Sequence, residues 1–165
     1  MRNMIEKLPP ITISRRDHAR LTRLAAHAVR DRHPAGEFLL SEIQRAVVCD
    51  ANKMPRDVAG LDEWVTYRLD GSQQAESRIL TCPDQFRSTQ LNLSVLSPLG
   101  AAILGMRAGD CIEFFGIEGG LHVVDVESVV APTSAPVLFP LKVRREAGRS
   151  AADPRGPDDE GPSAA

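Results

Sequence analysis

Two acidic residues, Asp31 and Glu37, are candidates for binding a metal ion, because they lie on either side of the turn Pro34-Ala35-Gly36. Carboxylates that converge can hold a divalent cation such as Mg²⁺. The two residues are six positions apart and on opposite sides of the turn, so they do not form a pair on one helical face. We assign them no metal, and the alternative is that they converge across the turn and bind Mg²⁺.

Other reactive side chains are scattered along the chain. Cys49, Cys82 and Cys111 are widely separated, no CxxC pair occurs, and no histidine joins a cysteine at the spacing of zinc ligands. The phosphate-binding, dinucleotide-binding, nucleophile-elbow and zinc-protease patterns are also missing. His122 follows a glycine-rich turn, where a structural histidine is expected. The sequence therefore predicts no catalytic residue, no metal site and no cofactor.

Basic residues gather near the amino end of the chain. Residues 12–32 hold six arginines against two aspartates, whereas residues 33–144 hold nine basic residues against fourteen acidic ones. Arg16, Arg20 and Arg23 form a basic helix face. This face is either a solvated surface with complementary packing or a prong that enters an acidic groove on a partner or touches nucleic acid, DNA included.

The composition limits the second reading. The net charge is −2, too close to neutral for a general polyanion binder, and only 4% of residues are aromatic, too few for a base-stacking platform. We therefore expect no sequence-specific nucleic acid contact. No apolar run reaches the length of a membrane span and no signal-type segment begins the chain, which predicts a cytoplasmic protein without a membrane partner.

The segments that position these residues begin with a helical hairpin, residues 12–50. Ser14 is the expected N-cap of a helix from about Arg15 to Asp31. The apolar residues of this helix fall on one face: Leu21, Leu24, Ala25 and Ala28. A second helix is predicted to end near Cys49, with Ala46 and Val47 inside and Glu42 and Arg45 outside. Helices joined by a short turn pack antiparallel, which predicts a short coiled coil.

The body, residues 51–131, is predicted to be strands around one helix. The expected strands cover residues 64–69, 78–82, 91–95, 111–115 and 121–130. Ser97 and Pro98 are typical of a helix start, and Gly105 suits its end. Strands in hairpins around one helix predict an α+β domain with an antiparallel sheet. Residues 1–11 are expected to be an amino-terminal arm, 132–144 an apolar extended strap, and 145–165 a disordered tail without core-forming side chains.

Several runs of the sequence carry a resemblance to a known family. The run Leu93–Asp110 resembles the carboxy-terminal domain of the bacterial Gre transcript-cleavage factors, with a strand, a Ser-Pro helix start, small residues and a Gly-Asp turn. Four further segments are similar to one branch, the nucleoside diphosphate kinase regulator family: residues 42–49, 54–58, 65–68 and 78–83. The likeness is collinear from about Ile11 to Val130.

The resemblance implies a short antiparallel coil joined to an FKBP-like antiparallel sheet domain with one helix. It also implies a partner, RNA polymerase, with the sheet domain at the rim of the secondary channel and the coil directed inward. The matching contact positions are Ser97 and Pro98, and we add their neighbours Leu99 and Gly100.

The catalytic role of Gre factors does not carry over, because it needs two acids spaced D-x-x-E at the tip of a long coil. Asp31 and Glu37 do not have this spacing, so we expect a transcription elongation regulator that occupies the Gre site without promoting cleavage. Two alternatives stay open. One is regulation of nucleoside diphosphate kinase through a protein partner. The other is a prolyl isomerase with a pocket built from aromatic residues of the body: Trp64, Tyr67, Phe86, Phe114 and Phe115.

Overall fold

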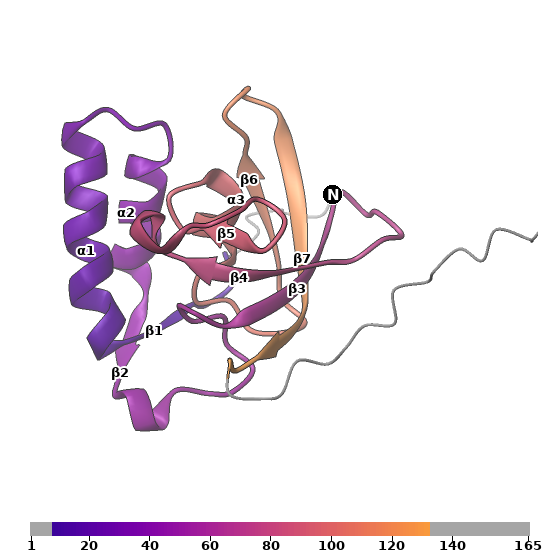
Figure 1. Cartoon of the computed structure of the whole chain (residues 1–165), viewed down its shortest axis with the longest axis horizontal. Coiled ribbons are helices and arrows are strands. Elements are labelled where there is room, and N and C mark those ends of the chain that lie inside the picture. Colours follow the sequence, from indigo (N-terminus) through magenta and orange to yellow (C-terminus); the bar gives the residue numbers. More distant parts are fainter. Residues whose placement is uncertain (1–7, 133–165) are drawn as a thin grey trace, which may run out of the picture.

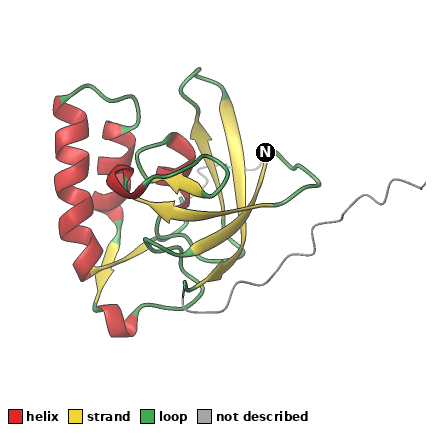
Figure 2. Ribbon diagram, viewed as in Figure 1, coloured by secondary structure: helices red, strands yellow, loops and turns green. Residues whose placement is uncertain are grey.

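The computed structural model describes residues 8–132. Most of the expected arm, all but the first residue of the expected strap, and the expected tail lie outside the described residues. The observed architecture is α+β: a helical hairpin, a small two-stranded sheet at its base, and a five-stranded sheet with one further helix (Figure 1, Figure 2). No helix of the described part is long and apolar enough to cross a membrane.

The helical hairpin consists of α1 (Arg15–Arg30) and α2 (Gly36–Arg45). The predicted N-cap is confirmed, because the Ser14 hydroxyl accepts a hydrogen bond from the Asp17 amide at 3.1 Å. At 1.5 Å per residue, α1 is about 24 Å long and α2 about 15 Å. The hairpin is therefore present as predicted, with a second helix shorter than expected.

The prediction that the second helix runs to Cys49 is wrong. Ala46 is already extended, and Val47–Cys49 form strand β2, which pairs in parallel with β1 (Thr12–Ser14). The Val47 amide donates to the Ile11 carbonyl at 2.9 Å, so a partner 36 residues earlier ends the helix. We call the paired β1 and β2 the clasp, because it joins the two ends of the helical hairpin.

The placement of Glu42 on the outer face is also wrong. Glu42 is only 2% exposed, and the Arg45 guanidinium donates to its carboxylate at 2.5 Å. Arg45 also donates to the Pro9 carbonyl at 2.6 Å. A buried carboxylate is tolerated when it is paired and hydrogen-bonded, and this pair fixes the segment that leads into β1.

The larger sheet has the order β5-β4-β3-β7-β6. Its strands are β3 (Trp64–Leu69), β4 (Glu76–Thr81), β5 (Asn92–Ser94), β6 (Cys111–Phe115) and β7 (Leu121–Val130). Short 3-10 turns, η1 (Ala51–Lys53) and η2 (Pro83–Gln85), precede β3 and follow β4. The expectation of a purely antiparallel sheet fails at one pair, because β5 lies parallel to β4. The chain returns through η2 and residues 86–91 before it enters β5 in the direction of β4.

One hydrophobic core joins the helical hairpin to the sheet. Its buried members include Leu21 of α1, Leu39 of α2, Leu80 of β4 and Ala101 of α3 (Pro98–Ile103). Figure 1 shows α2 between α1 and the sheet with α3, which leaves α1 outermost. The hairpin therefore shares its packing with the body instead of packing only on itself.

Candidate functional site

The loop between β5 and α3, residues 94–100, contains the four expected polymerase-contact residues. The Ser97 hydroxyl accepts from the Gly100 amide at 3.0 Å and donates to the Ser94 carbonyl at 2.7 Å. Pro98 occupies the first position of α3, where its missing N–H costs nothing. The polar atoms of Ser97 are thus occupied within the loop.

Gly100 explains why this loop can be so tight. A Cβ placed on Gly100 would lie 1.9 Å from the Ser94 carbonyl oxygen, far inside van der Waals contact. Gly100 is buried, whereas Ser97, Pro98 and Leu99 are half-buried. Ser97 and Gly100 shape the loop, and Ser97, Pro98 and Leu99 are among its partly exposed residues.

The tip of the helical hairpin, residues 31–36, begins with Asp31, and Glu37 directly follows it. Asp31 caps the end of α1, where its amide donates to the His27 carbonyl at 2.9 Å, and Glu37 lies in the first turn of α2. Both side chains are exposed, and no hydrogen bond or ion pair joins them among the described residues. The described residues also include no cluster of three or more His, Cys, Asp or Glu side chains that could hold a metal.

The three arginines of the basic helix face have two different environments. Arg16 and Arg23 are exposed, whereas Arg20 forms an ion pair with Asp84 of η2 at 3.0 Å. Arg20 therefore links the hairpin to the sheet, while Arg16 and Arg23 leave their charge open to solvent.

Sequence reasoning missed the partners of His122. Its Nδ1 lies 2.8 Å from Asp70 Oδ2, and its Nε2 lies 2.5 Å from Glu118 Oε1. Its ring stacks on that of Phe114, with the two ring centroids 5.6 Å apart. The hydrogen bonds to Asp70 and Glu118 raise the pKa of His122 and lower the pKa of both carboxyls. We call His122, Asp70 and Glu118 the histidine clamp. In the sequence, Asp70 precedes Gly71 and Glu118 precedes Gly119 and Gly120, a pattern typical of turns that does not reveal the contact with His122.

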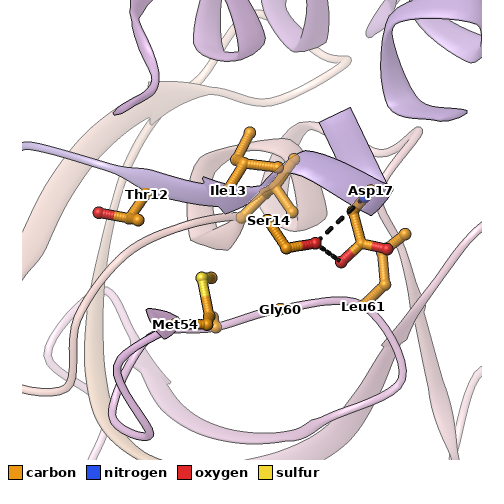
Figure 3. A pocket seen from close by; sticks show the side chains of 9 residues that line it. Thr12, Ile13, Ser14, Asp17, Met54, Gly60 and Leu61 are labelled. Carbon is orange, nitrogen blue, oxygen red and sulfur yellow. Dashed lines mark hydrogen bonds between the residues drawn. The ribbon is translucent and has the colours of Figure 1, made fainter. Parts of the chain in front are cut away.

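Two hollows of the described surface differ in size. The crevice in Figure 3, between Ser14, Asp17 and the segment from Met54 to Leu61, has no room for a water molecule. A groove of about 720 Å³ lies over β6 and β7. Of the five rings expected for an isomerase pocket, only Phe115 lines either hollow, while Tyr67 and Phe114 are buried in the core.

Two buried groups of the body, the Cys82 thiol and the Tyr67 hydroxyl, have raised pKa values. Burial raises the pKa of the Cys82 thiol, which lowers its thiolate fraction and its nucleophilicity. Burial also raises the pKa of Tyr67, whose hydroxyl donates to Glu76 at 3.1 Å. Neither group is prepared for nucleophilic or acid–base work near neutral pH.

Comparison with known proteins matches the chain in two consecutive parts. A family model described as Rnk N-terminus matches residues 9–48, and one described as transcription elongation factor GreA/GreB, C-term, matches residues 54–130. The regulator of nucleoside diphosphate kinase of Escherichia coli strain K12 is 31% identical over 122 residues, which cover 72% of this chain and 90% of that protein. The chain belongs to the family of regulators of nucleoside diphosphate kinase. The regulator of Shigella flexneri matches to the same extent.

A solved structure of a Gre factor is similar to this chain in fold and in sequence. The prokaryotic transcription elongation factor GreA/GreB from Nitrosomonas europaea is 30% identical, with a TM-score of 0.59, over 73% of this chain and 98% of that one. The family resemblance inferred from residues 42–110 is therefore confirmed. All of the clasp except Cys49 lies within the Rnk match, and the loop 94–100 lies within the GreA/GreB match.

Proposed function

We propose that this chain is a non-catalytic regulator that binds RNA polymerase near its secondary channel, competes with Gre factors and modulates transcription elongation. One observation carries the proposal: the likeness to a GreA/GreB factor extends over 98% of that factor and so is not confined to the sheet domain. A shared arrangement of both parts supports a shared docking site, whereas a common sheet domain alone would support only a common fold.

The hairpin geometry supports occupation without stimulation of cleavage. A second Mg²⁺ at a nucleotidyl-transfer centre needs converging carboxylates, since two metals must hold the attacking and leaving oxygens. Asp31 and Glu37 lie at the ends of separate helices, and no hydrogen bond joins them within the described part of the chain. The second helix is only about 15 Å long at 1.5 Å per residue, which is short for reaching deep into a channel.

The test measures binding of the full chain to core RNA polymerase, with a Gre factor as competitor, and transcript cleavage in a backtracked complex. We expect saturable binding, displacement by the Gre factor and slower Gre-stimulated cleavage. The paired change Ser97→Ala and Pro98→Ala should weaken binding. Ser14→Ala is the matched control, because it also removes a helix N-cap worth about 1 kcal/mol but lies outside the loop. Absence of binding by the unaltered chain would contradict the proposal.

A second candidate function rests on the name of the relatives, which are regulators of nucleoside diphosphate kinase. In this case the chain acts on the kinase through a protein contact or through transcription. Purification of the tagged full chain from a cell lysate separates the two candidates by the partner recovered, polymerase or kinase. The dispersal of the aromatic residues gives an isomerase no comparable support.

A further inference from the structure

The outer face of α1 carries a longer basic surface than three arginines. Basic residues occur at positions 16, 20, 23, 27 and 30, with alternating spacings of four and three that keep them on one face. We call Arg16, Arg20, Arg23, His27 and Arg30 the arginine stripe. At 1.5 Å per residue the stripe is about 21 Å long. It lies away from the buried residues of α1, which are Leu21, Ala25 and Ala28.

Folding does not account for this stripe. Among the described residues, only Arg20 of the stripe forms an ion pair, with Asp84. Arg16, Arg23, His27 and Arg30 are exposed. Like charges three or four positions apart on a helix repel one another and lower its stability. Because only one of these charges is paired within the described residues, the helix is expected to gain from an external partner.

The surroundings of the stripe suit the approach of another protein. Ala19 and Ala26, seven positions apart, are both exposed and border the stripe, so small side chains stand beside it. Figure 1 shows α1 as the outermost element on its side of the molecule. A partner helix could therefore lie close to α1 and bring carboxylates to the arginines, which bind them in a bidentate manner.

A protein fits this stripe better than a nucleic acid. Two aspartates lie near the amino-terminal half of the stripe: Asp84 pairs with Arg20, and Asp50 pairs with the neighbouring Arg15. A continuous phosphate backbone along the stripe would be repelled by these two carboxylates. In addition, α1 contains no Phe, Tyr or Trp, the larger rings on which a base stacks most strongly. Separate carboxylates on a protein surface can match the arginines and avoid the two aspartates.

We propose that the arginine stripe docks on an acidic, helical protein surface, and that this surface belongs to RNA polymerase. The inference rests on the proposed function, and it adds a second contact besides the loop 94–100. Contacts between exposed charges mainly raise the association rate and make binding sensitive to salt. The stripe therefore speeds association with the partner, while the loop 94–100 provides a surface whose shape fits the partner.

The test compares two triple variants of the full chain for binding to core RNA polymerase. Arg16→Gln, Arg23→Gln and Arg30→Gln together remove three charges from the stripe, and glutamine keeps helix propensity. As the matched control, Arg56→Gln, Arg78→Gln and Arg107→Gln remove the same number of charges from the body. They also break the ion pairs of Arg78 with Glu76 and of Arg107 with Asp57, which makes this control the more demanding of the two for the fold. At about 0.1 M salt we expect about tenfold weaker binding and a flatter salt dependence for the stripe variant, against less than about twofold for the control.

The outcomes separate this inference from the proposed function. If the unaltered chain binds polymerase and the stripe variant binds equally well at all salt concentrations, the stripe is not a contact and the proposed function still stands. If the unaltered chain does not bind polymerase, both fail. Binding to a single-stranded RNA oligonucleotide is measured in parallel. Loss of RNA binding in the stripe variant, with polymerase binding unchanged, would assign the stripe to nucleic acid and overturn the inference. Circular dichroism confirms that both variants are folded.

Discussion

The tip of the helical hairpin and the loop 94–100 are both tight turns built on a glycine, yet they use their polar groups in opposite ways. A Cβ on Gly36 would lie 2.9 Å from the Ala28 carbonyl carbon, and one on Gly100 would lie 1.9 Å from the Ser94 oxygen. In the loop the Ser97 hydroxyl is fully used inside the turn. At the tip the carboxylates of Asp31 and Glu37 face solvent.

This difference distinguishes turn residues that the fold requires from turn residues that it does not require. Ser97 and Gly100 of the loop are specified by the fold, because the hydroxyl and the missing side chain each have an internal reason to be there. The acids of the tip have no such reason, so they can be exchanged at little cost to the fold. Substitutions in the two turns should therefore have very different effects on stability, and this can be measured.

The largest effect is expected for Gly100→Ala. The methyl group would overlap the Ser94 carbonyl, which belongs to a backbone that cannot yield, so we expect a loss of about 3 kcal/mol in the free energy of unfolding. Urea denaturation measures it. Gly71→Ala is the control: Gly71 has a φ of +68 with nothing within 4 Å, so only backbone strain of about 1 kcal/mol is expected. Equal losses in the two variants would refute the clash.

A smaller effect is expected for Gly36→Ala at the tip. The added methyl group would press on the Ala28–Val29 backbone and spread the ends of α1 and α2, at a cost of about 1.5 kcal/mol. Gly60→Ala is the control, because its methyl group would meet only the carboxyl end of Glu63 at 3.3 Å. If Gly36→Ala proved as stable as the unaltered chain, the close helix contact at the tip would be disproved.

The histidine clamp predicts a pH-dependent difference. Because the pKa of His122 is raised in the folded state, its stabilisation is complete below the ordinary histidine value of 6.5 and is lost as the pH rises through the raised value. The lowered pKa values of Asp70 and Glu118 act in the opposite direction: their stabilisation is present above the ordinary carboxyl values of 3.8 and 4.5 and is lost in acid. The clamp should therefore contribute most between the carboxyl values and 6.5.

Urea denaturation of the unaltered chain and of His122→Gln tests this window. The stability difference between them should be larger at about pH 5.5 than at about pH 8.5. His27→Gln, at an exposed position on α1 outside the clamp, is the control for loss of an imidazole. A difference for His122→Gln that does not vary with pH would show that the clamp carries no proton-linked energy.

The smallest effect is expected for the paired change Asp31→Ala and Glu37→Ala. Asp31 at the end of α1 opposes the helix dipole, whereas Glu37 at the start of α2 favours it, so the two changes should nearly cancel, within about 0.5 kcal/mol. Inhibition of Gre-stimulated cleavage should also be unchanged. Cleavage promoted by the unaltered chain alone, and lost in the double variant, would mean that the two acids bind Mg²⁺ after all.

Features set by neighbouring residues were predictable from the sequence. Ser14 caps α1 through a residue three positions away, and the strands 64–69, 111–115 and 121–130 follow from alternation and turn residues. Features set by distant residues were not. Val47 leaves the second helix because Ile11 offers a carbonyl, and β5 runs parallel to β4 because of the path of the intervening loop.

The same limit applies to the candidate site. Ser97 and Gly100 were identified from a local motif, but the reason for Gly100 lies in the Ser94 carbonyl that folds over it. His122 meets Asp70 only because β7 pairs with β3. Glu42 was expected outside because helical periodicity does not reveal that Arg45, itself held by the Pro9 carbonyl, pairs with it.

The clasp has a consequence for how this family can change over evolutionary time. Since β1 directly precedes α1 and β2 follows α2, their parallel pairing fixes the distance between the two helix ends at the base, whatever happens at the other end. Whole turns of helix inserted in both arms next to residues 31–36 would lengthen the hairpin and leave the clasp register and the sheet unchanged. The reach of the hairpin is thus an adjustable dimension of an otherwise constant scaffold.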